Sequence, residues 1–200
     1  MLAEIWIVGD SIVRWAEARA TERGTPTLTA AGISLNWNGR SSMSTLDLHG
    51  VLQFGLLQGL SPSMIVMHLG GNDIDNSNTC KIIKHLKANV RYLFCNFPQA
   101  LIVWTYILPR FQWRNTDNSE ESLLKMDKKR KRINRQIKEW VLSWPNGRVI
   151  LHKDITCDTP GFFLPDGVHL SDIGNDMYLL TLQDAITSFL TDPTIQVAGI

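Results

Sequence analysis

Short apolar runs alternate along the chain with longer stretches in which apolar residues recur every three or four positions. The short runs are rich in Ile, Val, Trp and Leu and are bounded by Gly, Pro or Asn, a pattern that is typical of β-strands. They predict strands at Ile5–Val8, Ile33–Trp37, Met64–Leu69, Leu101–Ile107 and Val149–His152. The longer stretches predict helices near residues 12–22, 45–58, 80–95, 119–143 and 171–190.

This alternation indicates the fold class. Strands that are apolar on both faces must be covered on both faces, and right-handed crossovers between parallel strands supply the covering helices. We therefore expect an α/β protein, a doubly wound three-layer α/β/α sandwich around a five-stranded parallel sheet. A chain of 200 residues with 44% hydrophobic content can close one sizeable core. We expect one domain over residues 1–190 and a frayed tail over 191–200, where Pro193 lies among small residues.

The fourth predicted helix is the most clearly amphipathic. Ser119 can cap its start, and Glu120 and Glu121 suit its first turn. Its apolar face is formed by Leu123, Met126, Ile133, Ile137, Trp140, Val141 and Trp144. Its opposite face is formed by Lys125, Lys128, Lys129, Lys131, Arg132, Arg135 and Lys138. We interpret the basic run Lys128–Arg132 as a solvated helix face rather than a nuclear-localisation or RNA-contacting segment, because no aromatic residues interleave with the charges.

Charge and cysteine content narrow the function classes. Twenty basic and nineteen acidic residues leave a formal net charge of +1, so the whole molecule has no strong attraction to nucleic acid or to an anionic membrane. Cys80, Cys95 and Cys157 form no CxxC pair, which argues against a disulfide framework and a zinc site. Residues 1–8 lack the features of a signal peptide, and no stretch approaches an apolar membrane span. We therefore expect an intracellular, cytoplasmic protein, with the nucleus at times as the alternative.

Polar motifs follow the first three predicted strands. In a parallel sheet, ligands bind beyond the carboxyl ends of the strands, so a site is expected there. Residues 9–11 (GDS) place Ser11 at the positive end of a helix with its hydroxyl facing the cleft, and a simple helix cap is the alternative. Gly39 can bring a backbone N–H close to a ligand or serve as an ordinary turn glycine. Within residues 70–73 (GGND), Asn72 can aim an amide donor into the same cleft.

A fourth motif precedes the last predicted helix. Within residues 164–171 (LPDGVHLS), Asp166 and His169 lie three apart, so the carboxylate can meet one imidazole nitrogen while the other points outward. A histidine held in this way has a fixed tautomer and is ready to accept a proton. Ser171 is expected to cap the helix, which leaves Asp166 for His169.

Two metal sites are weighed and rejected. A calcium loop beginning at DIDNSN needs glycine at its sixth position and glutamate at its twelfth, where this chain has Asn78 and Lys84. The polar segment 152–158 (HKDITCD) matches no standard ligand spacing, and ordinary loop polarity is the favoured interpretation. We therefore expect no metal.

Taken together, the motifs resemble the four blocks of the SGNH (GDSL-type) hydrolases, in their order and at their places in the fold. The matching residues are Gly9-Asp10-Ser11, Gly39, Gly70-x-Asn72-Asp73 and Asp166-x-x-His169. The resemblance covers the chain from Ile5 to about Leu190, although Ile12 replaces the leucine of the family signature. The sequence also resembles the esterase domain encoded in the first open reading frame of vertebrate non-LTR retrotransposons. The similar segments are IWIVGDSIVRWA, MIVMHLGGND, ILPR and LPDGVHLS.

The resemblance implies a flavodoxin-like sandwich and the hydrolysis of carboxylic esters or thioesters, with no metal or organic cofactor. It implies that Ser11 is the nucleophile, that His169 is the general base and that Asp166 orients the imidazole. It also implies an oxyanion hole formed by the backbone N–H groups of Ser11 and Gly39 and the side-chain amide of Asn72.

Residues beside the motifs are candidates for substrate contacts. Met43, Ile74 and Phe163 can line an acyl pocket, with core packing as an equal alternative. Arg110 follows the fourth strand and can meet a polar head group or form a surface salt bridge. We expect a small-molecule or lipid acyl ester as substrate. Acetyl and other short acyl groups are the preferred candidates, because nothing in the sequence supplies an obvious lid. The oligomeric state, including a homo-oligomer, stays open.

Two other function classes compete with an esterase. One is a non-catalytic assembly or RNA-associated module that keeps the fold and uses Lys128–Arg132 as its contact. The other is a flavin or nucleotide binder, which is disfavoured because no GxxxxGK[ST] or GxGxxG sequence follows the first strand. A pure scaffold does not need the complete set of Ser11, Gly39, Asn72, Asp166 and His169, which favours catalysis.

Overall fold

The strands form one parallel sheet in the computed structural model, which describes residues 3–26, 28, 32–192 and 194–199. The strand order is β2-β1-β3-β4-β5-β6, and each neighbouring pair is parallel. The strands are β1 (Ala3–Gly9), β2 (Ile33–Gly39), β3 (Met64–His68), β4 (Leu101–Thr105), β5 (Gly147–Ile150) and β6 (Val197–Ala198). The helices are α1 (Ser11–Glu22), α2 (Leu48–Leu57), α3 (Thr79–Asn96), α4 (Glu120–Leu142) and α5 (Asp172–Thr191), with a short 3-10 helix η1 (Gly71–Asp73). The predicted α/β fold class is confirmed.

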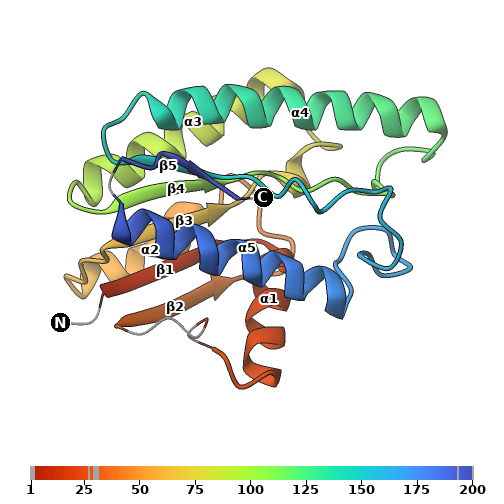
Figure 1. The fold of residues 1–200 in the computed structure, drawn as a ribbon. Coiled ribbons are helices and arrows are strands. Elements are labelled where there is room, and N and C mark those ends of the chain that lie inside the picture. The colour runs from red at the N-terminus through yellow and green to blue at the C-terminus, as the bar shows by residue number, and fades with distance from the viewer. Residues whose placement is uncertain (1–2, 27, 29–31, 193, 200) are drawn as a thin grey trace.

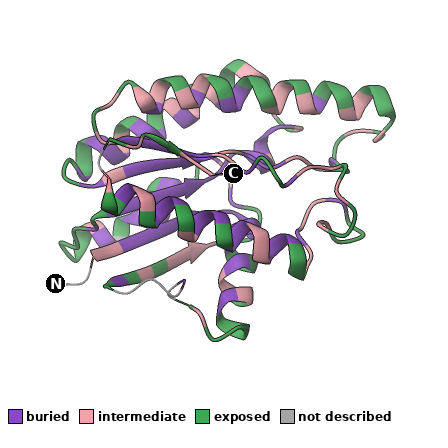
Figure 2. Cartoon of the chain, in the orientation of Figure 1, coloured by how far each residue is buried: buried purple, intermediate pink, exposed green. Residues whose placement is uncertain are grey.

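Helices cover both faces of the sheet, and the layers are visible in Figure 1. α1 and α5 pack on one face, whereas α2, α3 and α4 pack on the other. Successive side chains of a strand point to opposite faces. Ile5 and Ile7 of β1 therefore join the core under α1 and α5, and Trp6 and Val8 join the core on the other face. Figure 2 shows the central strands β1, β3 and β4 as mostly buried, whereas the edge strand β2 is mostly intermediate or exposed.

The sheet has one strand more than the sequence predicts. β6 lies within the segment predicted to fray, and it pairs with the open edge of β5. The N–H of Val149 donates to the carbonyl of Gln196 at 2.9 Å, and the N–H of Leu151 donates to the carbonyl of Ala198 at 2.8 Å. These bonds satisfy edge donors of β5. The predictions of five strands and a frayed tail are therefore wrong for this segment, while Pro193 lies outside the described residues.

Helix α4 has the predicted amphipathic form. Ser119 caps it by accepting a hydrogen bond from the N–H of Ser122 at 3.3 Å. Its buried residues are Met126, Ile133, Asn134, Ile137 and Val141. No helix within the described residues is both long enough and apolar enough to cross a membrane.

The packing of α5 predicts a contrast between two of its leucines. Leu182 is fully buried, whereas Leu180 is 50% exposed. Leu182→Ala should lower the free energy of unfolding by about 2–5 kcal/mol, because it leaves a cavity in the core. Leu180→Ala should change it by no more than about 0.5 kcal/mol. Urea denaturation of both variants measures the difference, and equal losses would contradict the burial of this face.

Candidate active site

Strand β1 ends where the chain turns directly into α1. A Cβ atom on Gly9 would lie 2.2 Å from the carbonyl oxygen of His68, so only glycine fits at this position. Asp10 caps the helix, because its Oδ1 accepts a hydrogen bond from the N–H of Ile12 at 3.0 Å. Ser11 is consequently the first residue of α1 and lies at the positive end of the helix dipole.

His169 connects Ser11 to Asp166. Its Nε2 lies 3.0 Å from Ser11 Oγ, and its Nδ1 lies 2.7 Å from Asp166 Oδ2. Ser11 and His169 are 158 positions apart in the chain. The structure therefore contains the contact between hydroxyl and imidazole that the sequence motifs require.

Asp166 is held by the loop that carries it. Its Oδ1 accepts hydrogen bonds from the N–H groups of Val168 and His169, both at 2.9 Å, and Gly167 makes the turn at a φ of +66°. Burial raises the pKa of Asp166, but hydrogen bonds from the His169 ring and from these two N–H groups outweigh it, and the pKa lies below its usual value. A carboxylate only accepts hydrogen bonds, so in the neutral imidazole this contact puts the hydrogen on Nδ1 and leaves the Nε2 lone pair for Ser11.

Gly39 lies against the first turn of α1. The register of β1 and β2 sets Gly39 beside Gly9. A Cβ atom on Gly39 would lie 2.3 Å from the backbone nitrogen of Arg14 and 2.9 Å from the carbonyl carbon of Val13. The end of β2 can therefore approach the helix that begins with Ser11 only because this residue is glycine.

Asn72 lies in η1, a few residues after the end of β3. Its Nδ2 donates to the carbonyl of Met43 at 3.1 Å, and its Oδ1 accepts from Arg110 Nη2 at 3.3 Å. The next residue, Asp73, accepts from both the N–H and the hydroxyl of Thr45 at 3.0 Å. The loop after β2 and the loop after β3 are thus bonded to each other beside the site.

The predicted substrate contacts lie in different surroundings. Met43 is only 2% exposed and Ile74 is not exposed, and both belong to the core under α2, α3 and α4. The prediction that they line an acyl pocket is therefore wrong for this structure, and the alternative of core packing holds. Phe163 is half-buried and packs edge-on against Phe111, with ring centroids 5.3 Å apart.

Arg110 turns inward rather than toward solvent. Its side chain is 9% exposed, and its Nη2 lies 3.8 Å from Oδ2 of the fully buried Asp10. The guanidinium also lies 5.2 Å from the ring centroid of Trp113. This burial disfavours the surface salt bridge, whereas the head-group contact stays a prediction, because Arg110 lines a cavity.

Trp15 is a neighbour of the site that the motifs did not reveal. Its ring centroid lies 6.2 Å from that of His169, and the residue is 48% exposed. It lies four residues after Ser11 in α1, on the same side of the helix. That helical spacing is the sequence signal that points to a residue at the rim of the site.

A buried polar cluster lies beneath the ends of β3 and β4. Thr105 Oγ1 lies 2.7 Å from His152 Nε2 and 3.4 Å from His68 Nδ1. The ring of His152 stacks on that of Tyr178, with centroids 4.6 Å apart. Burial, together with the charge of Arg110, lowers the pKa of His68 to about 3, and burial also lowers the pKa of His152. Both imidazoles are therefore neutral at physiological pH.

Among the described residues, no group of three or more His, Cys, Asp or Glu side chains is arranged to hold a metal ion. Cys80, Cys95 and Cys157 are free thiols.

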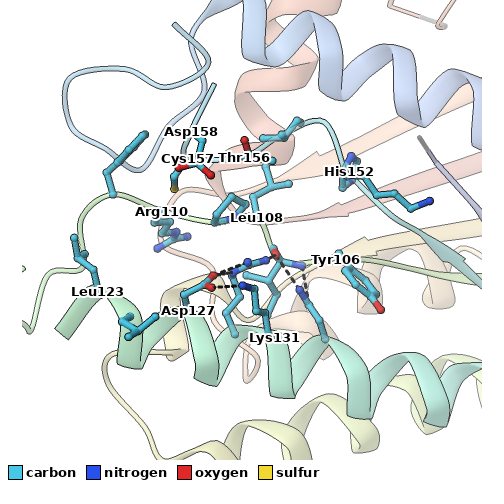
Figure 3. Close-up of a pocket in the computed structure, with 18 of the residues that line it drawn as sticks. Tyr106, Leu108, Arg110, Leu123, Asp127, Lys131, His152, Thr156, Cys157 and Asp158 are labelled. Atoms are coloured by element: carbon cyan, nitrogen blue, oxygen red, sulfur yellow. Dashed lines mark hydrogen bonds and ion pairs between the residues drawn. The ribbon is translucent and has the colours of Figure 1, made fainter. Parts of the chain in front are cut away.

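A cavity of about 800 Å³ lies beside α4, between the loops that follow β4 and β5 (Figure 3). Leu108, Leu123 and Ile155 contribute apolar walls, and Asp127 and Lys131 lie at its α4 side. Its lining includes Arg110 but none of Ser11, Gly39, Asn72, Asp166 and His169. The cavity is therefore a neighbour of the Ser11–His169 pair and not the place where the two side chains meet.

Solved structures match this fold, whereas no family model and no curated protein matches the sequence. A lipolytic protein of the G-D-S-L family from Veillonella parvula has a TM-score of 0.71 at 16% identity, over 92% of this chain and 98% of that one. The psychrotrophic esterase EstA from Pseudoalteromonas sp. has a TM-score of 0.64 at 17% identity, over 95% and 100%. The acetyl xylan esterase AlAXEase has a TM-score of 0.66 at 18% identity, over 92% and 99%. The chain therefore has the fold of G-D-S-L-type lipolytic proteins and esterases.

The two glycines at positions 39 and 50 predict opposite responses to alanine. Gly39→Ala should lower the free energy of unfolding by about 1–3 kcal/mol, because the new Cβ collides with the backbone of α1. Gly50→Ala, in α2, meets no atom within 4 Å and should raise stability by roughly 0.5–1 kcal/mol. Thermal and urea unfolding measure both effects. A neutral Gly39→Ala would contradict the close approach of β2 to α1.

Proposed function

We propose that the protein is a serine esterase that hydrolyses carboxylic esters. The observation that carries the proposal is the pair of hydrogen bonds that link Ser11 Oγ to His169 Nε2 at 3.0 Å and His169 Nδ1 to Asp166 Oδ2 at 2.7 Å. This order of hydroxyl, imidazole and carboxylate is the arrangement that activates a serine nucleophile. The buried rings of His68 and His152 contact Thr105 and Tyr178, whereas the ring that contacts Ser11 is that of His169.

The reaction follows from this geometry in two half-reactions. Ser11 Oγ attacks the ester carbonyl carbon while His169 Nε2 takes its proton, and Asp166 stabilises the imidazolium that forms. His169 then returns the proton to the leaving alkoxide, so that the alcohol departs and an acyl-serine remains. A water molecule attacks the acyl-serine with His169 again as base, and the collapse releases the acid and restores Ser11.

The negative charge that develops on the carbonyl oxygen requires donors. The N–H groups of Ser11 and Gly39 and the side-chain amide of Asn72 are the proposed oxyanion hole. Such donors are worth on the order of 3–4 kcal/mol each in the transition state. The helix N-terminus at Ser11 adds a favourable dipole.

Three features favour substrates with small acyl groups, and acetyl esters are the proposed best substrates. Met43 and Ile74 are sealed in the core and provide no acyl pocket. The large cavity beside α4 is lined by none of the proposed catalytic residues. The acetyl xylan esterase among the solved structures of this fold is named for an acetyl ester.

A narrower proposal rests on the similarity of the sequence around Gly9-Asp10-Ser11 and residues 164–171 to retrotransposon esterase domains. We propose that the chain is the esterase domain of a first-open-reading-frame protein of a non-LTR retrotransposon. The activity proposed above does not depend on this origin.

An RNA-associated module without catalysis is less well supported. Lys129 Nζ donates to the backbone carbonyls at positions 74 and 77, and Arg130 and Lys131 form ion pairs with Asp127 at 2.5 and 2.7 Å. These contacts engage the middle of Lys128–Arg132 within the protein itself. They leave less of the run free to contact phosphates than the sequence suggests.

Ser11→Ala tests the proposed nucleophile. Its turnover of p-nitrophenyl acetate should fall by roughly four to six decades, because the acyl-enzyme can no longer form. A fluorophosphonate probe should label the wild-type protein at Ser11 and leave Ser11→Ala unlabelled. Ser143→Ala, at the far end of α4, is the matched control and should retain full activity. An active Ser11→Ala, or labelling at another serine, would refute the proposed function.

Acyl-chain preference is tested with p-nitrophenyl esters of increasing chain length. Acetate should give the highest kcat/KM. Each added methylene should bring little gain, because a buried CH₂ contributes about 0.8 kcal/mol only where an apolar pocket receives it. A steady rise of kcat/KM with chain length would contradict the proposed preference without affecting the role of Ser11.

A further inference from the structure

Arg110 is a buried cation beside the proposed oxyanion hole. Burial lowers its pKa and the charge of Asp10 opposes this shift, but an arginine keeps its charge in proteins. A buried charge requires partners, and removal of one partner is costly. The partners of Arg110 can therefore explain why the loop after β4 places a guanidinium beside Asn72.

Asp10 is the first of these partners. It is fully buried, and its Oδ1 accepts a hydrogen bond from the N–H of Ile12 at the start of α1. Its Oδ2 lies 3.8 Å from Arg110 Nη2 and has no hydrogen-bond partner among the described residues. Asp10 thus faces the helix that begins with Ser11 on one side and the guanidinium on the other.

Gly71 explains how a third loop closes over this pair. A Cβ atom on Gly71 would lie 2.5 Å from Arg110 Nη2 and 3.4 Å from Asp10 Oδ2. The second glycine of the GGND motif therefore leaves room for the guanidinium next to η1. No catalytic step uses this glycine, so its place in the motif is explained by Arg110.

Asn72 is the partner that matters for the reaction. A guanidinium has only donors, so the amide atom that faces Arg110 Nη2 at 3.3 Å must be Oδ1. The Nδ2 group then faces the carbonyl of Met43 at 3.1 Å. A flipped amide would set donor against donor at Arg110 and acceptor against acceptor at Met43. An amide carries two N–H hydrogens, so one stays available for the oxyanion.

We propose that Arg110 is a positioning residue of the esterase: anchored by Asp10 and enclosed by Gly71, it fixes the orientation of the Asn72 amide that stabilises the oxyanion. This inference rests on the proposed function. Arg110 does not touch the reacting atoms, and it acts through Asn72. Because Asn72 contributes in the transition state, loss of Arg110 lowers kcat and leaves KM nearly unchanged.

A double-mutant cycle on the full chain tests the coupling, with p-nitrophenyl acetate as substrate. Asn72→Ala lowers kcat by roughly a hundredfold to a thousandfold. Arg110→Met lowers kcat by roughly tenfold to a hundredfold, the size of effect that a misplaced catalytic group produces. In the Asn72→Ala background, Arg110→Met changes kcat by less than about twofold, because the group it positions is already gone.

Two controls separate positioning from folding and from general charge effects. Arg114→Met removes an exposed arginine from the same loop and leaves kcat unchanged within about twofold. Arg110→Met can unfold the protein, because it leaves Asp10 buried without its counter-charge. Arg110→Met/Asp10→Asn removes both charges and keeps the helix cap, because asparagine also caps helices. This variant should fold, as followed by circular dichroism, and show the same loss of kcat.

The outcomes are distinguishable. Equal losses of kcat from Arg110→Met in the wild-type and Asn72→Ala backgrounds would show independent action and overturn the inference. A normal kcat for Arg110→Met would overturn it too, as would a failure of both Arg110 variants to fold, which would make the arginine a requirement of the fold. An inactive wild-type protein, or one that fluorophosphonate does not label at Ser11, would instead overturn the proposed function itself.

Discussion

The carboxyl edge of the parallel sheet is the constraint on which the rest of the structure depends. β1 pairs with β2 on one side and β3 on the other, all in the same direction, so Gly9, Gly39 and His68 end side by side. Each crossover helix returns the chain to the amino ends of the strands. The loops that follow the strands therefore collect at the carboxyl ends. Polar residues far apart in sequence, such as Asp10 and Arg110, consequently lie close together there.

Close approach at this rim depends on glycines at three of the loop junctions. A Cβ atom would lie 2.2 Å from its nearest neighbour at Gly9, 2.3 Å at Gly39 and 2.5 Å at Gly71. Each contact joins a different pair of segments: β1 with β3, β2 with α1, and η1 with the loop after β4. At Gly9 and Gly39 the missing side chain lets two backbone segments touch, and at Gly71 it leaves room for the Arg110 guanidinium.

Burial gives similar groups at this rim different chemistry. Burial raises the pKa of Asp10, although the charge of Arg110 opposes the shift, whereas hydrogen bonds lower the pKa of Asp166 in its exposed loop. His68 is kept neutral by burial, while His169 lies at the surface with a carboxylate on its Nδ1. The same two residue types thus occupy contrasting environments: Asp10 and His68 are enclosed in the interior, whereas Asp166 and His169 belong to a loop at the rim.

Periodic segments and local motifs were readable from the sequence, because the forces that determine them act between near neighbours. Five strands, the face of α4 and the Asp166–His169 pair follow from side-chain spacing and turn chemistry. Strand β6 was not readable, since two residues carry no period and pair only because β5 offers an open edge. The inward direction of the Met43 and Arg110 side chains was likewise decided by tertiary structure. A loop has no repeating apolar face, so its side chains turn toward the charges and cavities that neighbouring loops provide.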